Sequence, residues 1–161
     1  MQSSQLKYHI YRLSEKFFQK YSAISNSEVL LKRERPYNCL LIKTKFDYFI
    51  CIPYRTEIRH KEAFFFKKSQ RAQTHKSGLD YSKIVIIDDL SYIDQSPVII
   101  DKDEFTETRL NIGKIAQQAS SYIDTYVNHC NGTKVISKAT FLRKYKYSTL
   151  KNFHKELGIE K

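Results

Sequence analysis

Hydrophobic positions in the first third of the chain fall into short runs that predict strands. Residues 7–13, "KYHIYRL", alternate apolar and polar side chains, as a half-buried strand does. Ser14 follows as a helix cap, and the segment "SEKFFQKY" presents three aromatic residues on a short helix. The runs "YNCLLIKT" (37–44) and "YFICIP" (48–53) are joined by a short link, Lys45 to Asp47, and predict a β-hairpin.

The middle of the chain continues this pattern with further strands and one polar loop. The segment "EAFFFKK" (62–68) predicts a third strand after the hairpin, and "YSKIVIID" (81–88) predicts a buried one. Between them, "SQRAQTHKSGLD" (69–80) has the composition of an exposed loop, in which we expect Gly78 to supply a backbone angle that other residues resist. "SPVIID" (96–101) predicts a shorter strand.

From residue 101 onward the apolar spacing changes to that of a helix. Asp101 or Asp103 caps a long helix whose apolar residues recur every three or four positions from Phe105 to Cys130, with Gly113 as a place where it bends. Asn131 and Gly132 end it. A last short helix, "TLKNFHKEL", lies between Ser148 and Gly158. These elements predict a single α+β domain over residues 1–161, a compact, strongly twisted, mainly antiparallel sheet with packed helices.

The charge balance points to a polyanionic partner. The chain has 28 Lys and Arg against 17 Asp and Glu, a formal net charge of +11, together with 12 Tyr and 10 Phe. Cations and aromatic rings are the side chains that contact phosphates and stack on bases, so nucleic acid is the favoured partner. The alternative is that the excess charge only keeps the protein soluble.

Cysteine usage and the N-terminal sequence favour a cytoplasmic protein. Cys39 and Cys51 lie inside apolar runs, where a thiol acts as a small core residue, and the three cysteines have no CxxC spacing. The N-terminus lacks the apolar stretch of a signal peptide, and no run approaches the length of a membrane span. We therefore expect a soluble protein in the cytoplasm.

Metal and cofactor chemistry have little support in the sequence. The five histidines do not pair at helical spacing, and the chain has no HExxH motif or cysteine cluster. Asp88 and Asp89 at a strand end are more typical of a solvated turn than of a magnesium site. With four glycines, neither GxGxxG nor a P-loop is present, and GxSxG is absent too. We expect no metal and no cofactor.

One stretch does carry catalytic residue types. In "CIPYRTEIRHK" (51–61) an apolar strand opens directly onto Arg55, Thr56, His60 and Lys61. Cleavage of RNA through its 2′-hydroxyl needs cations for the phosphate, a hydroxyl to position it and a group that moves a proton, and these four side chains suit those roles. The alternative is a solvated loop with a lone histidine.

The order of motifs resembles a known toxin family. "RPYNCLLIKTKFDYFICIPYRTEIRHKEAFFF" (35–66), followed by "KSGLDYSKIVIID" (76–88), an apolar strand and a long helix, is similar to the toxins of type III toxin–antitoxin systems. These are the ToxN/AbiQ-like endoribonucleases, and the likeness is greatest to the CptN and TenpN branches. It extends from about residue 8 to residue 126.

The resemblance implies a specific activity and partner. Such toxins are bacterial, metal-independent endoribonucleases with a strongly bent antiparallel sheet, and they cut RNA in A-rich contexts to leave a 2′,3′-cyclic phosphate and a 5′-hydroxyl. Their antitoxin is a tandem-repeat RNA that the toxin cuts into pseudoknots, which inhibit it in closed toxin–RNA complexes. The family acts in phage defence by abortive infection and in plasmid maintenance, on cellular or phage mRNA.

The resemblance also assigns roles to residues. Thr56 matches the family hydroxyl, whereas Arg55 stands where the ToxN branch has another hydroxyl and Ile58 where it has a lysine. With His60 and Lys61 these give the expected catalytic set. The expected RNA-binding residues lie before the hairpin and on a second wall of the site: Lys32, Arg33, Arg35, Tyr37 and Asn38, then Asp80, Tyr81, Ser82 and Lys83. Alternatives remain open: Tyr37 and Tyr81 as sheet residues, Asp80 as a turn cap, and the whole chain as a non-catalytic RNA- or DNA-binding protein.

Overall fold

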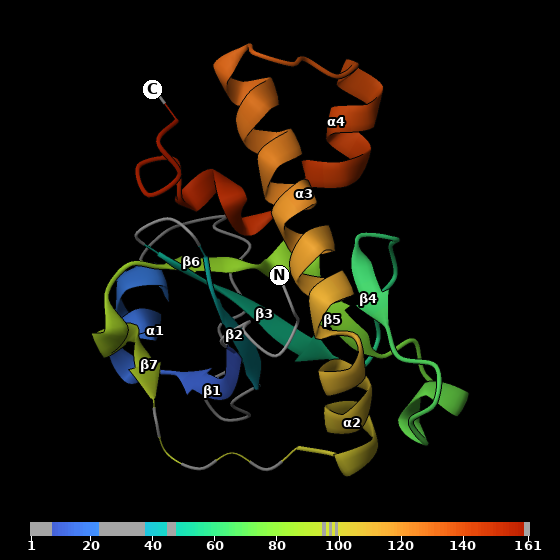
Figure 1. Ribbon diagram of the computed structural model, residues 1–161. Coiled ribbons are helices and arrows are strands. Elements are labelled where there is room, and N and C mark those ends of the chain that lie inside the picture. The colour runs from blue at the N-terminus through green and yellow to red at the C-terminus, as the bar shows by residue number, and fades with distance from the viewer. Residues whose placement is uncertain are drawn as a thin grey trace.

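The computed structural model describes residues 8–22, 38–44, 48–94, 96, 98 and 100–159. Within these residues the chain forms one seven-stranded sheet, in the order β4-β5-β3-β2-β1-β7 with β6 paired to β3 (Figure 1). The strands are β1 (Tyr8–Leu13), β2 (Cys39–Lys43), β3 (Phe49–Arg55), β4 (Ala63–Phe65), β5 (Gly78–Asp80), β6 (Val85–Ile87) and β7 (Ile93–Asp94). Each of these pairings is antiparallel.

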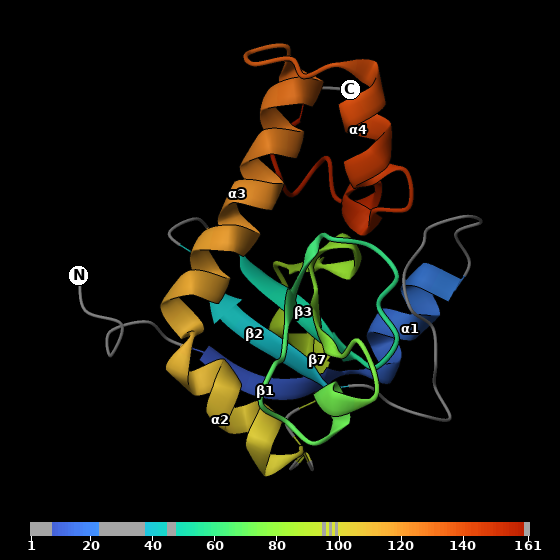
Figure 2. The same cartoon turned by 90° about the vertical axis from the view of Figure 1, so that its right-hand side faces the viewer.

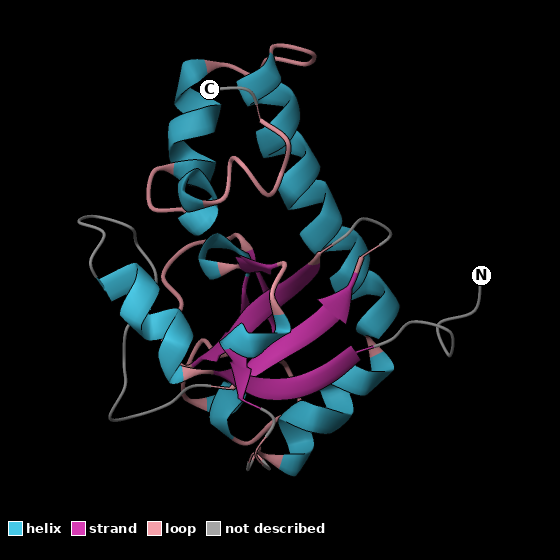
Figure 3. Cartoon of the chain, turned by 90° about the vertical axis from the view of Figure 1, so that its left-hand side faces the viewer, coloured by secondary structure: helices cyan, strands magenta, loops and turns pink. Residues whose placement is uncertain are grey.

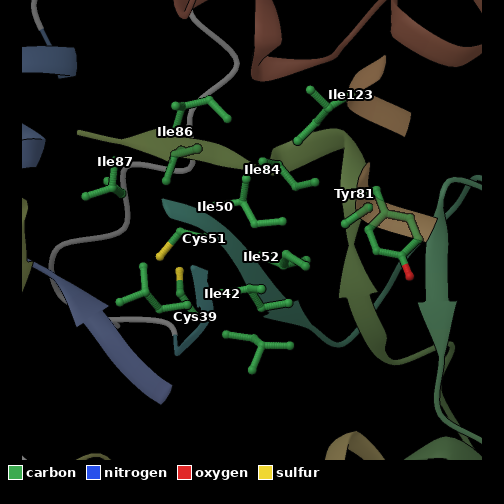
Figure 4. Packing of buried hydrophobic residues seen from close by; sticks show 14 of the residues in the cluster. Cys39, Ile42, Ile50, Cys51, Ile52, Tyr81, Ile84, Ile86, Ile87 and Ile123 are labelled. Atoms are coloured by element: carbon green, nitrogen blue, oxygen red, sulfur yellow. The ribbon is translucent and has the colours of Figure 1, made fainter. Parts of the chain in front are cut away.

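The hairpin of β2 and β3 forms the centre of the sheet. All of β2 except Lys43 is buried, and so are residues 50–53 of β3. A run of consecutive buried residues means that both faces of these strands are covered. Figure 4 shows isoleucines of β3 and β6 packed together beside Cys39 and Cys51, whose thiols are free.

Helices cover the two sides of this centre. Helix α1 (Glu15–Ser22) and helix α3 (Ile112–Asn131) lie on opposite sides of the sheet in both Figure 1 and Figure 2. Ser14 caps α1, since its hydroxyl accepts a hydrogen bond from the Phe17 amide at 3.4 Å. The buried residues of α3 recur every three or four positions: Ile112, Ile115, Ala119, Tyr122, Ile123 and Tyr126.

The C-terminal part of the chain is built on α3. Helix α4 (Lys138–Tyr145) runs beside the end of α3 that rises beyond the sheet (Figures 1 and 3). Two reciprocal bonds join the helices, because the Tyr145 hydroxyl donates to the Tyr122 carbonyl at 2.7 Å and the Tyr122 hydroxyl donates to the Lys144 carbonyl at 3.1 Å. The 3-10 helix η5 (Thr149–Asn152) then places Leu150 in the core.

The α+β class is confirmed, with five corrections to the elements. The predicted long helix is two helices, α2 (Lys102–Leu110) and α3, which break at Asn111 rather than at Gly113. Helix α4 was not predicted. The strand expected over residues 96–101 is not formed at the described positions 96, 98, 100 and 101, and β7 lies before it. The segment after Ser148 is a short 3-10 helix.

The fifth correction concerns the loop before the buried strand and its glycine. Residues 69–77 contain the 3-10 helix η2 (Arg71–Gln73), but Gly78 begins strand β5 and has no left-handed backbone angle. A Cβ at this position would lie 2.1 Å from the Phe64 carbonyl oxygen on β4. Glycine is therefore required because the neighbouring strand approaches closely, which is a different reason from the one expected.

No helix in the described part of the chain is long and apolar enough to cross a membrane.

Candidate active site

Sheet register brings the two predicted walls of the site together. Strand β5 pairs with the end of β3, with Arg55 opposite Gly78 and Tyr54 opposite Leu79. Asp80 therefore lies diagonally across from Arg55 on the same face, a separation that a long side chain can span. The Nη1 atom of Arg55 donates to Oδ2 of Asp80 at 2.8 Å.

Asp80 is the centre of this cluster, and its side chain has no exposed surface. Its Oδ1 atom accepts hydrogen bonds from the Ser82 amide at 2.9 Å and from the Ser82 hydroxyl at 2.7 Å. The Nε2 atom of His60 lies 3.1 Å from the same oxygen. The first of these bonds also caps the 3-10 helix η3 (Tyr81–Lys83), so the turn expected of Asp80 is present.

The hydrogen bonds keep Asp80 ionised. Burial on its own pushes the pKa of a carboxyl group upward, but hydrogen bonds from His60, Ser82 and Arg55 outweigh it and hold the pKa of Asp80 below its usual value. A buried carboxylate with a guanidinium partner is thus the resting state of the site.

Both ring nitrogens of His60 have partners within the protein. Its Nδ1 atom accepts a hydrogen bond from the Glu62 amide at 3.0 Å. Its Nε2 atom lies 3.1 Å from the Ser82 hydroxyl, which gives its own proton to Asp80. A nitrogen that accepts from an amide carries no proton, so this geometry assigns the neutral tautomer with the proton on Nε2.

A pocket of about 240 Å³ is lined in part by residues that are adjacent in sequence to this cluster. Its lining includes Lys61 and Glu62, which follow His60, and Tyr81, which lies between Asp80 and Ser82. Gln118 of α3 and Lys144 of α4 also line it. Two contacts order these groups: Tyr81 donates to Gln118 Oε1 at 2.7 Å, and Lys144 pairs with Glu62 at 3.0 Å.

The remaining predicted residues differ in their solvent exposure. Thr56 directly follows β3 and is half-buried, and Lys61 is exposed. Asn38 is half-buried beside β2, and its carbonyl accepts from the Tyr54 amide. Lys83 donates to the Tyr147 carbonyl at 2.9 Å. Lys32, Arg33, Arg35 and Tyr37 lie outside the described residues, so their expected RNA contacts stay predictions.

Burial changes the interpretation of the second wall. Asp80, Tyr81 and Ser82 are all buried, and burial raises the pKa of the Tyr81 hydroxyl. Their burial argues against direct contact of these three side chains with RNA. The expected contacts stay predictions. Their observed contacts give them another role, which is to hold Arg55, His60 and Gln118 in place.

Seven of the nine residues that line the pocket were not predicted: Glu62, Ala63, Gln118, Ser121, Tyr122, Thr125 and Lys144. Lys144 lies in the basic run "RKYK" (143–146), and this run is a sequence signal from which Lys144 could have been predicted. Gln118 is one of many polar residues on α3, and nothing in its local sequence distinguishes it. Among the residues that the structure describes, no three His, Cys, Asp or Glu side chains gather where they could hold a metal ion.

Comparison with known proteins finds no match, whether with family models, curated proteins or solved structures. The assignment to a family therefore depends on the motif resemblance alone and is a proposal.

Proposed function

We propose that this protein is a metal-independent endoribonuclease, the toxin of a type III toxin–antitoxin system of the ToxN/AbiQ-like family. The observation that carries the proposal is the position of Arg55, whose guanidinium is held by a buried carboxylate close in the chain to a lysine-lined pocket. The motifs of residues 35–66 and 76–88 supply the family.

Arg55 is suited to bind the scissile phosphate. A guanidinium has five N–H donors in a planar fork, and Asp80 takes the donor of one nitrogen, Nη1. The Arg55 side chain keeps 30% of its surface exposed, and no second partner is present among the described residues. In this proposal the other donors meet phosphate oxygens, as preorganised charge does when it stabilises a transition state.

The reaction itself transfers a phosphoryl group within the RNA. The ribose 2′-oxygen bonds to phosphorus as the bond to the 5′-oxygen breaks; the proton lost by the first oxygen is balanced by the proton gained by the second, so no water is consumed. Arg55 and Lys61 neutralise the phosphate, and the Thr56 hydroxyl positions it. A product with a 2′,3′-cyclic phosphate and a 5′-hydroxyl follows.

His60 has a positioning role in this proposal. A proton-transfer group needs one ring nitrogen available to the substrate, and in this geometry both nitrogens are engaged with Glu62, Ser82 and Asp80. The proton exchange expected of His60 remains untested and requires the ring to leave one of these partners.

The partners and the cell compartment follow from the same proposal. The toxin acts in the bacterial cytoplasm on cellular or phage mRNA, and it processes a tandem-repeat antitoxin RNA whose pseudoknots inhibit it in a closed complex. The formal charge of +11 supports an RNA partner.

A second candidate function is a non-catalytic RNA- or DNA-binding protein. The engagement of both His60 nitrogens favours it, because a protein that only binds RNA needs no group that exchanges protons.

Incubation of the purified protein with single-stranded RNA in excess EDTA separates the two functions. We expect fragments that end in a 2′,3′-cyclic phosphate and a 5′-hydroxyl. RNA that is bound but left whole would support the binding protein instead, and cleavage that appears only when magnesium is restored would refute the mechanism.

A further inference from the structure

The C-terminal part of the chain carries a one-sided charge, of which only Lys144 lines the pocket of the candidate site. Residues 133–155 contain seven Lys and Arg and no Asp or Glu, whereas the whole chain has 28 against 17. The seven are Lys134, Lys138, Arg143, Lys144, Lys146, Lys151 and Lys155. This segment, which we name the basic segment, holds a quarter of the basic residues. Among the described residues, only Lys144 of the seven forms an ion pair, with Glu62.

The basic segment is firmly mounted on the protein. Tyr145, Leu150 and Phe153 are buried beneath it, while the basic side chains other than Lys144 are exposed. The bond from Lys83 to the Tyr147 carbonyl ties its turn to η3, the wall that carries Ser82. Charges fixed on a rigid support favour a polyanion because little conformational entropy is lost on binding.

The exposed ring of Tyr147 distinguishes this surface from one whose charges only keep the protein soluble. Its side chain is 60% exposed, although other aromatic residues of this region, such as Tyr145 and Phe153, are buried. The Nζ atom of Lys146 lies 5.3 Å from the ring centroid. An exposed ring among cations is the combination with which proteins stack bases and hold phosphates of single-stranded nucleic acid.

The surface also joins the candidate site. Lys144 belongs to the basic segment and lines the pocket with Lys61 and Gln118. Lys144 therefore connects the pocket of the candidate site with the exposed cations of α4 and the segment after it.

We propose that the basic segment binds single-stranded RNA, with Tyr147 stacking on a base and with Lys146 and Lys151 contacting phosphates. This inference rests on the proposed function, because it takes RNA to be the substrate, and it adds a binding surface outside the residues that the family resemblance assigns.

The test uses a fluorescent 2′-O-methyl RNA oligonucleotide, which has no free 2′-hydroxyl and is not cleaved, and measures its binding by anisotropy over a series of salt concentrations. Tyr147→Ala is expected to weaken binding by roughly five- to a hundredfold, the range for loss of one stacked base. Tyr147→Phe keeps the ring and is expected to bind within about twofold of wild type. The double variant Lys146→Gln/Lys151→Gln is expected to reduce the salt slope by about 1.4, since each phosphate contact on a single strand contributes about 0.7.

The matched control is Lys102→Gln/Arg109→Gln, which removes two exposed cations from α2, at the other end of α3 from α4 (Figure 1). It removes the same charge and is expected to leave affinity and salt slope nearly unchanged. A melting temperature equal to that of the wild type verifies that each variant is folded. We expect this result because these side chains are exposed.

The outcomes separate the two proposals. Wild-type RNA binding that neither Tyr147→Ala nor the lysine variant changes would overturn this inference and leave the proposed function standing. Equal effects of the two double variants would show nonspecific charge attraction and would overturn it too. Tighter binding to anionic vesicles or to duplex DNA than to the oligonucleotide would assign the surface to those partners. Absence of any RNA binding by the wild type would remove the proposed function as well.

Discussion

Replacement of Asp80 by asparagine tests the cluster that holds Arg55. The substitution keeps the shape of the side chain and an oxygen that can accept from Ser82, but it removes the charge that faces the Arg55 guanidinium. Removal of one partner from a buried ion pair costs about 3–5 kcal/mol when both groups are buried. Because the Arg55 and His60 side chains remain 30% and 34% exposed, water compensates part of this loss, and we expect about 2–3 kcal/mol.

Urea unfolding followed by circular dichroism measures this change in the free energy of unfolding. In a domain of this size, about 2–3 kcal/mol corresponds to a fall in Tm of roughly 4–12 °C. The control is Asp88→Asn, which replaces an exposed carboxylate at the end of β6 and is expected to change stability by less than about 0.5 kcal/mol.

The difference between wild type and Asp80→Asn should also depend on pH. The folded protein holds the pKa of Asp80 below the value of about 3.9 in an unfolded chain, so the stabilisation is complete above about pH 4. It is lost as the pH falls through the lower folded pKa, where wild-type Asp80 becomes neutral like asparagine. A difference of the same size at pH 3 and pH 7, or no difference at pH 7, would refute the assigned role of the charge.

Three further substitutions test the scaffold around the site. Gly78→Ala is expected to destabilise the protein by about 3 kcal/mol, because the new Cβ would lie 2.1 Å from the Phe64 carbonyl oxygen. Gly113→Ala, whose Cβ would have no atom within 4 Å, is expected to stabilise α3 by about 0.5–1 kcal/mol. Equal melting temperatures of the two variants would contradict both expectations. Glu107→Gln loses one of two 2.8 Å bonds from the amides of residues 67 and 68, so hydrogen exchange should rise there and not in α4.

The sequence alone predicts the elements that have a strong local signal. The hairpin, the first strand and the cap at Ser14 each follow from a few adjacent residues, and all are present. Helix α4 was missed because its short segment "KATFLRKY" buries only Tyr145 completely, against residues of α3 that are distant in the chain. Periodicity within eight residues does not reveal such a tertiary contact.

The candidate site was predicted in its parts but not in its connections. The resemblance named Arg55 and Asp80 for separate walls, yet their ion pair spans 25 residues and depends on the register of β3 with β5. Register is set by the whole sheet, so no local pattern shows that Asp80 is enclosed by Arg55, His60 and Ser82. Ile58 illustrates the same limit: it stands where the resemblance places a lysine, and it is fully buried in this fold.

The most direct test of the account compares cleavage by Arg55→Ala and Arg59→Ala. Each variant removes one guanidinium, from residues only four positions apart: Arg55 ends strand β3 and is held by Asp80, whereas Arg59 lies in the segment that follows, is exposed and has no described partner. Single-turnover cleavage of an RNA oligonucleotide in EDTA gives the rates, and DNA of the same sequence serves as the uncleavable reference for binding. We predict that Arg55→Ala slows cleavage by roughly a hundredfold or more, the cost of a lost charge-stabilising donor, while Arg59→Ala stays within about threefold of wild type. Equal rates for the two variants, or cleavage of the DNA, would contradict an RNase site centred on Arg55.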